Sequence, residues 1–357
     1  MNARRTQKSS RASGNGTRPR RGWARYKDQK LLDERICDLD LRVERTWLAA
    51  CVERMQEELE ERGIRFRPHV WLSSEWFSPD GIPGIAIPFY LAHPRLILLE
   101  RKQMLEVEGG TEAHCMRILR HEAGHVLDTA YRLHFKPEWR KTFGRYSEPY
   151  PDTYRPKPNS RNFVMHLESW YAQAHPAEDF AETFAVWLTP RSRWRKRYRE
   201  WPRVLRKLQF VDRVMQEHVA GRAPRVVSRV KVDPANRSSQ TLQEYYEEKR
   251  KRYSVQGNHQ YDRDLRRLFS SEPQYANRPT GASVLRGMRR EIRTTVAEWT
   301  GAPAYTIDQV LQELIDRCRE LKLRAAVPQN RLKTQATLLS TVQTLNCLHV
   351  GRYVIPL

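Results

Sequence analysis

Apolar residues recur at helical spacing early in the chain and predict a long helix there. This helix is expected over residues 40–62 and ends at Gly63, because glycine readily adopts the left-handed conformation that follows many helices. Its apolar face consists of Leu48, Val52, Met55 and Leu59. The next apolar stretches, residues 69–77 and 95–100, have the composition of strands, and a loop rich in glycine and proline separates them.

A second helical pattern follows Thr111, a residue type that commonly caps helix N-termini. One face of this helix is apolar and should be buried: Leu119, Ala123, Val126 and Ala130. His121, His125 and Asp128 fall on the opposite face, within about 60° of one another at 100° per residue. A plain amphipathic helix would present lysine and glutamate there, so side chains suited to ligand binding indicate a special role.

A third helix is predicted to begin at Pro176, since proline fits the first turn of a helix, and to end before Pro190. Glu178 and Glu182 are four residues apart and therefore share a face. The same face carries Ala181 and Ala185, whereas Phe180, Phe184 and Leu188 lie on the other side. Small residues beside the carboxylates would let another helix approach closely.

The C-terminal part of the sequence returns to helical periodicity after a polar stretch. Residues 225–282 contain few apolar clusters and are expected to form a linker or a loosely packed extension. A helix over residues 283–300 would end at Gly301. Another would open with a capping box from Thr306 to Gln309. Its buried face would consist of Val310, Leu314, Cys318 and Leu321.

Composition narrows the class of protein. The 357-residue chain has a net charge of +22, so an anionic partner such as nucleic acid, a membrane surface or an acidic protein is compatible with it. Part of that charge lies in residues 1–30, which carry ten Lys/Arg against one acid and are expected to be a disordered tail. The five cysteines form no CxxC pair, which favours reduced thiols in the cytoplasm over a disulfide framework. No apolar run is long enough to predict a membrane span or a secretory signal.

The segment RHEAGH contains the spacing HExxH, which places two imidazoles one helical turn apart where both can reach one zinc ion. Glu122 follows the first histidine and could act on a water molecule at the open metal position. The alternative is a chance spacing on an ordinary helix. A catalytic zinc site needs a third protein ligand. A suitable ligand elsewhere in the chain would therefore favour a zinc site over a chance spacing.

Glu178 is the favoured third ligand, with Glu182 as an acceptor that orients an imidazole N–H. Two carboxylates on an otherwise apolar helix are costly to bury unless they are paired or bound to a metal. Two exposed glutamates on a helix edge are the simpler alternative. His175 is the rival ligand, although its place before Pro176 suits a helix boundary better, and His166 is a weaker candidate. Asp128 could also orient a ligand or could be an ordinary solvated side chain.

The motif pair HEAGHVLD and HPAEDFAETFA resembles the gluzincin pattern, in which HExxH is followed by a helix carrying ExxxE or ExxxD. It is similar to a bacterial family of zinc-binding metallopeptidases and to the catalytic domain of anthrax lethal factor. The resemblance covers about residues 40–220 and implies that His121, His125 and Glu178 bind one Zn²⁺ per chain. It also implies that Tyr171, seven residues before Glu178, donates a hydrogen bond to the oxyanion.

The expected architecture is therefore α+β and zincin-like: a small mixed sheet over the active-site helix and a second glutamate-bearing helix, with an additional mainly helical region. The expected domains are a tail (1–30), a metallopeptidase domain (31–224), the polar extension (225–282) and a helical C-terminal region (283–357). The edge of the sheet could pair with an extended peptide substrate. Residues 81–92 are either a wall of the substrate cleft or simple core packing.

The segment 191–207 alternates arginines and lysines with Trp194, Tyr198 and Trp201. Such a pattern suits stacking on nucleic-acid bases, but the aromatic rings could instead pack on the core while the basic groups face water. The sequence thus favours a zinc peptidase acting on a peptide or protein. The alternatives are a basic nucleic-acid or partner-binding protein with a purely structural zinc site, and an effector protease whose C-terminal region recognises one protein.

Overall fold

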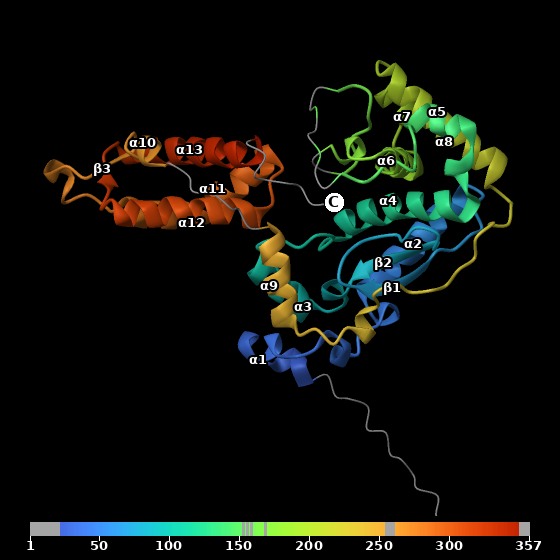
Figure 1. Cartoon of the computed structure of the whole chain (residues 1–357), viewed down its shortest axis with the longest axis horizontal. Helices are drawn as coiled ribbons and strands as arrows, with labels where there is room; N and C mark the ends of the chain where they lie inside the picture. The colour runs from blue at the N-terminus through green and yellow to red at the C-terminus, as the bar shows by residue number, and fades with distance from the viewer. Residues whose placement is uncertain are drawn as a thin grey trace, which may run out of the picture.

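A computed structural model describes residues 22–151, 154, 157, 160–167, 170–253 and 261–349 (Figure 1). Residues 1–21, which were expected to be disordered, lie outside the described residues. Residues 22–30, which were assigned to the same tail, are ordered: a 3₁₀ helix spans Gly22–Arg25 and buries Trp23. No helix in the described ranges is both long and apolar enough to cross a membrane.

The protein is α+β, mostly helical, with small sheets and a helical C-terminal region. The α-helices are α1 (Asp28–Leu32), α2 (Trp47–Glu61), α3 (Pro94–Met104), α4 (Glu112–Tyr131), α5 (Pro137–Phe143), α6 (Pro176–Leu188), α7 (Trp194–Arg197), α8 (Pro202–His218), α9 (Leu242–Tyr253), α10 (Asp262–Leu265), α11 (Gly281–Thr300), α12 (Ala304–Glu320) and α13 (Gln329–His349). The strands are β1 (His69–Ser73), β2 (Gly84–Pro88), β3 (Phe269–Ser270) and β4 (Arg324–Ala325).

Short 3₁₀ helices connect these elements. They are η1 (Gly22–Arg25), η2 (Ile36–Leu39), η3 (Val43–Arg45), η4 (Phe89–Ala92), η5 (Leu133–Phe135), η6 (Tyr171–Gln173), η7 (Ala235–Arg237) and η8 (Pro273–Tyr275).

The long N-terminal helix starts later than predicted. Helix α2 begins at Trp47 because the side chain of Thr46 accepts a hydrogen bond from the backbone N–H of Leu48 and caps the helix there. The preceding residues form the short helices η2 and η3 instead. The predicted end is confirmed, since Gly63 follows the helix with a φ of +76°. The four predicted apolar residues are all buried.

The sheet in the N-terminal half differs from the prediction in one strand. The stretch expected to be a strand at residues 95–100 forms helix α3, because His93 caps its N-terminus and Pro94 occupies its first position. The partner of β1 is instead β2, whose five residues are all buried, inside the segment expected to be a loop. A strand buried on both faces shows no apolar–polar alternation, which explains why the pattern hid it.

The sheet combines parallel and antiparallel pairing. Strands β1 and β2 are parallel, with His69 opposite Gly84, and Phe77 forms an antiparallel bridge with Ala86. A Cβ on Gly84 would lie 2.3 Å from the ring of His69, so any larger residue would displace that ring. Ser78, the residue after Phe77, contacts Glu122 in the middle of α4.

One hydrophobic core joins α2, α4, α6, α8 and the β1–β2 sheet. Helix α4 lies in its middle, with α6 on one side and α2 and the sheet on the other (Figure 1). Its predicted N-cap is confirmed, since the side chain of Thr111 accepts a hydrogen bond from the backbone N–H of His114. The predicted apolar face of α4 is fully buried.

The polar stretch 225–282 also contributes to the core. Leu242 and Tyr246 of α9 are completely buried in it. Lys249 forms an ion pair of 2.8 Å with Glu100 of α3, and both side chains are nearly inaccessible to solvent. This ion pair therefore holds α9 against α3. The domain limits inferred from the sequence stay a prediction.

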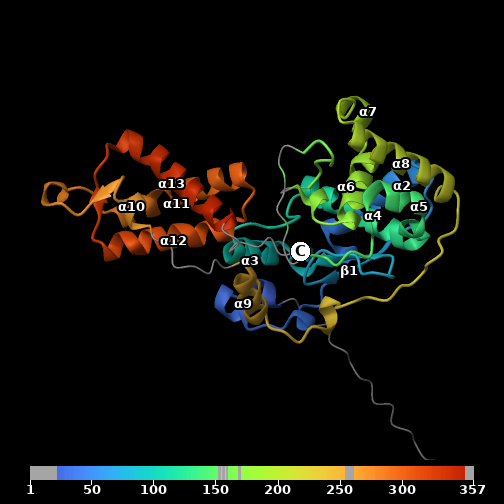
Figure 2. The same ribbon diagram turned by 45° about the horizontal axis from the view of Figure 1, so that its top comes forward.

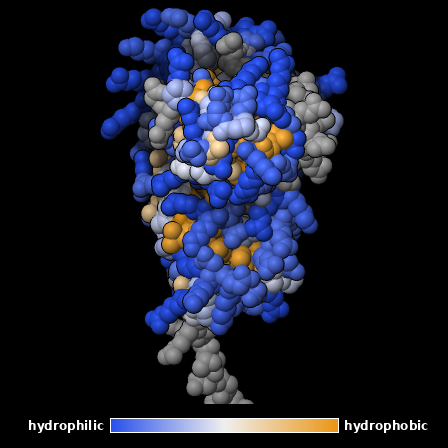
Figure 3. Space-filling model, turned by 90° about the vertical axis from the view of Figure 1, so that its left-hand side faces the viewer, coloured by the Kyte–Doolittle hydropathy of each residue, from blue (hydrophilic) through white to orange (hydrophobic). Residues whose placement is uncertain are grey.

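Helices α11, α12 and α13 pack around a second core and lie beside the first one (Figure 2). The end of α11 at Gly301 is confirmed by a φ of +68°. The capping box is wrong: α12 begins at Ala304, and the buried Thr306 donates a hydrogen bond to the backbone oxygen of Tyr253. Val310, Leu314 and Cys318 are buried as predicted, whereas Leu321 follows the end of α12 and is only partly buried. Hydrophilic side chains cover most of the bundle's end, with small apolar patches between them (Figure 3).

Candidate metal centre and active site

Helices α4 and α6 approach each other closely enough to share one polar site. Gly124 of α4 faces Ala181 of α6, and a Cβ added to Gly124 would lie 2.8 Å from the Cα of Ala181. Both residues are buried. The small side chains predicted on this face of α6 therefore allow the backbones to meet, and the polar residues of both helices face each other across the contact.

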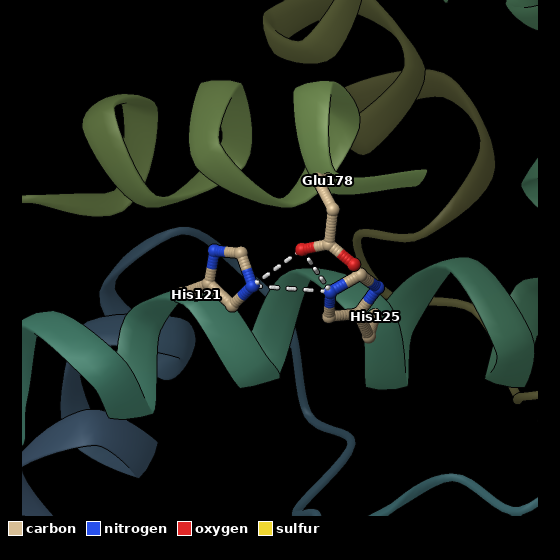
Figure 4. Close-up of side chains that lie close together, drawn as sticks. All are labelled: His121, His125 and Glu178. Atoms are coloured by element: carbon tan, nitrogen blue, oxygen red, sulfur yellow. Dashed lines mark hydrogen bonds and ion pairs between the residues drawn. The ribbon is translucent and has the colours of Figure 1, made fainter. Parts of the chain in front are cut away.

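Three donor atoms meet at this contact (Figure 4). Oε2 of Glu178 lies 3.0 Å from Nε2 of His121 and 3.2 Å from Nε2 of His125, and the two nitrogens are 3.1 Å apart. Zinc bonds to nitrogen and oxygen of about 2.0–2.1 Å in a tetrahedron require donor separations of roughly 3.3 Å. The near-equilateral triangle of one carboxylate and two imidazoles thus fits a zinc ion.

Glu182 fixes the orientation of one imidazole. Its Oε1 accepts a hydrogen bond from Nδ1 of His121 at 2.8 Å, and its Oε2 accepts one from the backbone N–H of Leu167 at 2.8 Å. With the proton on Nδ1, the lone pair of His121 Nε2 points toward Glu178 and is available to a metal ion. Glu182 is completely buried, so both of its oxygens depend on these donors.

The electrostatics of the three donors favour a bound positive charge. Burial opposes protonation of the imidazoles, but nearby carboxylates outweigh it: Glu178 and Glu182 raise the pKa of His121, and Glu178 raises that of His125. Burial likewise disfavours the charged form of Glu178, yet the two imidazoles lower the pKa of its carboxyl well below the usual range. The carboxylate therefore stays ionised, and the cluster attracts a cation.

Glu122 has a partner that the sequence analysis did not single out. The hydroxyl of Ser78 donates a hydrogen bond of 2.8 Å to Oε2 of Glu122. Ser78 directly follows Phe77, the residue bridged to β2, so the sheet fixes the position of the hydroxyl. No local spacing links Ser78 to the helix motif, which is why only the fold reveals the contact.

Tyr171 lies next to the donor cluster, in η6 just before α6. The centroid of its ring is 5.6 Å from that of His121. Burial, followed by the charges of Glu178 and Glu122, raises the pKa of its hydroxyl well above the usual range. The hydroxyl therefore keeps its proton at neutral pH and can donate a hydrogen bond.

Asp128 contacts another histidine than those of the cluster. Its Oδ2 lies 2.5 Å from Nδ1 of His134, a residue that the sequence analysis did not single out. Tyr146 stacks on His134 with 4.0 Å between the ring centroids and donates a hydrogen bond to Asp80. Asp128 thus belongs to a chain of side chains that fastens the C-terminal end of α4 to neighbouring loops.

The two rival histidines lie outside the donor cluster. His175 caps α6: its Nδ1 accepts a hydrogen bond from the backbone N–H of Ala177. His166 contacts the backbone oxygen of Arg117 through Nε2 at 2.9 Å. A second residue missed by the sequence analysis is Tyr150, whose hydroxyl donates a hydrogen bond of 3.0 Å to Oε1 of Glu178.

Two of the three aromatic rings in the basic segment 191–207 are buried, and the third, Trp201, is partly buried. Trp194 and Tyr198 are 4% and 2% exposed, and the guanidinium groups of Arg195 and Arg197 lie over their rings. Packing on the core therefore explains this pattern better than base stacking does. Residues 84–92, within the segment considered as a cleft wall, are buried as well.

Comparison with known proteins supports the class of metal-dependent peptidases. Residues 101–194 match the family model described as "Putative zinc-binding metallo-peptidase", which is about a quarter of the chain and includes α4 and α6 with all three donors. No curated protein and no solved structure matches the chain. The closer likeness to gluzincins and to the lethal factor domain stays a prediction.

Proposed function

We propose that the protein is a zinc-dependent metallopeptidase of the gluzincin type, with a zincin-like arrangement of α4, α6 and the sheet. The observation that carries this proposal is the triangle of His121, His125 and Glu178, whose donor atoms all lie within 4.8 Å of one another. The match of the same segment to a zinc-binding metallopeptidase family supports it independently.

The three donors would hold one Zn²⁺, which would polarise a peptide carbonyl and lower the pKa of a water molecule. Glu122 is the general base: its carboxylate takes a proton from the attacking water while the water oxygen bonds to the carbonyl carbon. The hydrogen bond from Ser78 holds one oxygen of Glu122, so the other oxygen is the proton acceptor.

Glu122 then delivers the proton to the leaving nitrogen as the C–N bond breaks, which gives a free amine and a carboxylate. Tyr171 keeps its hydroxyl proton and would donate a hydrogen bond to the oxyanion that forms during attack. Glu182 keeps His121 in the tautomer that can bind a metal ion. The substrate is a peptide or protein, in line with the family that the segment matches.

Elemental analysis of the purified wild type and of Glu178→Ala, with peptidase activity measured on the same samples, tests this proposal. We expect about one zinc per wild-type chain, because the site offers one set of three ligands. Glu178→Ala should lose both the zinc and the activity. A wild type that takes up no zinc, or a Glu178→Ala protein that binds it unchanged, would overturn the proposal.

A further inference from the structure

The two carboxylate oxygens of Glu178 have different partners. Oε2 faces the imidazoles of His121 and His125, at 3.0 and 3.2 Å. Oε1 accepts the hydrogen bond from the hydroxyl of Tyr150 at 3.0 Å. Glu178 is only 4% exposed, so the phenol replaces the water that would otherwise solvate Oε1.

Tyr150 is held in place by the residue that caps α6. Its ring stacks on the imidazole of His175 with 3.8 Å between centroids and 21° between planes. Because Nδ1 of His175 accepts from the backbone N–H of Ala177, the ring proton is on Nε2. Nε2 donates this proton to the backbone oxygen of Glu148 at 2.9 Å. His175 thus joins the first turn of α6 to the loop that carries Tyr150.

The start of the same loop also packs on α6. Gly144 has a φ of +118°, and a Cβ at this position would lie 3.1 Å from Cγ of Pro176, the first residue of the helix. The loop therefore contacts the N-terminus of α6 at both Pro176 and His175, one turn from Glu178. These contacts make the position of the Tyr150 hydroxyl dependent on the same turn that positions the carboxylate.

We propose that Tyr150 is a positioning residue that restricts Glu178 to one metal-binding oxygen, Oε2, and that His175 is the platform that keeps Tyr150 there. The proposal rests on the zinc site proposed above. A carboxylate with both oxygens free can bind a metal through either or both. With Oε1 engaged by the phenol, Glu178 supplies a single oxygen and leaves the remaining coordination position for water.

The two tyrosines at the site consequently have separate tasks. Tyr171 packs beside the ring of His121, and its proposed task is to bind the oxyanion. Tyr150 contacts the ligand Glu178 itself. Removing each hydroxyl should therefore change a different property of the protein.

The experiment compares Tyr150→Phe and Tyr171→Phe in the full chain. Zinc affinity is measured by competition with a chromophoric chelator, and the visible spectrum is recorded after loading with Co²⁺. Phenylalanine keeps the ring that stacks on His175 and removes only the hydroxyl. Loss of a hydrogen bond to a metal ligand typically weakens binding about 10–100-fold, so we expect this loss for Tyr150→Phe. Tyr171→Phe should keep the wild-type zinc affinity and lower kcat.

The Co²⁺ spectrum separates positioning from general structural damage. When Oε1 is released, Glu178 can bind through both oxygens, which raises the coordination number and weakens the visible absorption bands of the bound Co²⁺. Tyr150→Phe should show this change, and Tyr171→Phe should retain the wild-type spectrum.

The variant His175→Asn tests whether the ring of His175 keeps Tyr150 in place. Asparagine is a good N-cap and keeps α6 capped, but it lacks the aromatic ring. We expect zinc affinity to fall as in Tyr150→Phe, and the double variant to be no weaker than the weaker single one, because both changes remove the same contact. Fully additive losses would overturn the platform role.

The outcomes distinguish this inference from the proposed function. If Glu178→Ala loses zinc while Tyr150→Phe binds zinc and Co²⁺ as the wild type does, the role of Tyr150 is wrong and the zinc site stands. If the wild type binds no zinc, both proposals are wrong.

Discussion

The contact between α4 and α6 differs from the helical bundle of α11, α12 and α13 in how buried charge is balanced. In the described part of the bundle the buried carboxylate is Asp308, and it lies 2.5 and 2.9 Å from Arg289 and Arg293. Glu178 has two imidazoles as its charged neighbours instead. Arginine carries a permanent charge, whereas imidazole does not. The charge of Asp308 is therefore neutralised within the bundle, whereas the α4–α6 site is suited to receive a cation.

The two regions also differ in how closely their helices pack around glycine. Gly124 of α4 touches the backbone of α6, whereas the space around Gly287 of α11 is open for at least 4 Å. Gly124 thus allows a tight helix contact, whereas Gly287 takes part in none. Matched substitutions in the two regions can therefore test whether the close helix contact and the buried charges are needed for metal binding and catalysis.

Glu122→Gln should have the largest effect. Glutamine keeps the shape of the side chain and can accept the hydrogen bond from Ser78, but it cannot take up a proton. Loss of a general base lowers the rate about 10²–10⁴-fold, so kcat for peptide cleavage should fall by that factor while zinc content stays at the wild-type level. The same change at the exposed Glu298 of α11 should leave kcat unchanged. Wild-type turnover by Glu122→Gln would exclude this residue as the base.

Arg120→Met should cause the largest loss of stability. Arg120, next to His121, forms two hydrogen bonds of 2.7 Å with Glu58 of α2, and both side chains are less than 10% exposed. Breaking a buried pair costs about 3–5 kcal/mol. Arg54 lies 3.6 Å from Glu58, but its side chain is half exposed, so it compensates for only part of the loss. Urea unfolding followed by circular dichroism measures this loss.

The control for this prediction is the pair of Arg317 and Asp262 in the bundle region, whose side chains are 38% and 39% exposed. Arg317→Met should hardly move the unfolding midpoint, since solvent screens exposed pairs. Replacing Glu58 as well as Arg120 with methionine should restore much of the lost stability. If the single and double variants are equally unstable, the unpaired charge is not the cause.

How far the sequence predicts the site depends on whether the information is local. Helices α4 and α6 follow from caps, apolar spacing and prolines, all of which act within a few residues. The spacing from His121 to His125 likewise follows from one turn of one helix. That Glu178 lies opposite them depends on the α4–α6 contact, which the sequence indicated only through the small residues of α6 and the family resemblance.

The remaining contacts lie on loops, and no fixed spacing relates a loop residue to a helix motif. Ser78 reaches Glu122 because Phe77 pairs with β2, and β2 itself was hidden by its uniform burial. Tyr150 reaches Glu178 because its loop packs on His175. Helix α3 was misread as a strand because its leucines satisfy both patterns, and its start depends on the cap by His93. Such contacts require the tertiary structure.

Gly124→Ala should destabilise the protein. The new Cβ would lie 2.8 Å from Cα and 3.2 Å from the backbone oxygen of Ala181, and these backbone atoms cannot move without shifting α6. Overpacking costs about 1–3 kcal/mol, which exceeds the gain in helix propensity of up to about 1 kcal/mol. The shift of α6 would also move Glu178, so zinc affinity should fall together with the unfolding midpoint. An intact midpoint and intact zinc affinity would show that the helices tolerate a wider spacing.

Gly287→Ala, the matched change in the bundle, should have the smallest effect and the opposite sign. Gly287 is exposed within α11, and no atom outside the helix backbone near it lies within 4 Å of the position of a new Cβ. Alanine restricts the unfolded chain and favours the helix, which should raise stability by about 0.5–1 kcal/mol. Hydrogen exchange of the amides of α11 should slow accordingly, while zinc affinity and kcat stay at wild-type values. The contradicting result is a Gly287→Ala protein that is as unstable as Gly124→Ala is expected to be. Tight glycine contacts would then not distinguish the site from the bundle. The close approach of α4 and α6 would lose its link to metal binding.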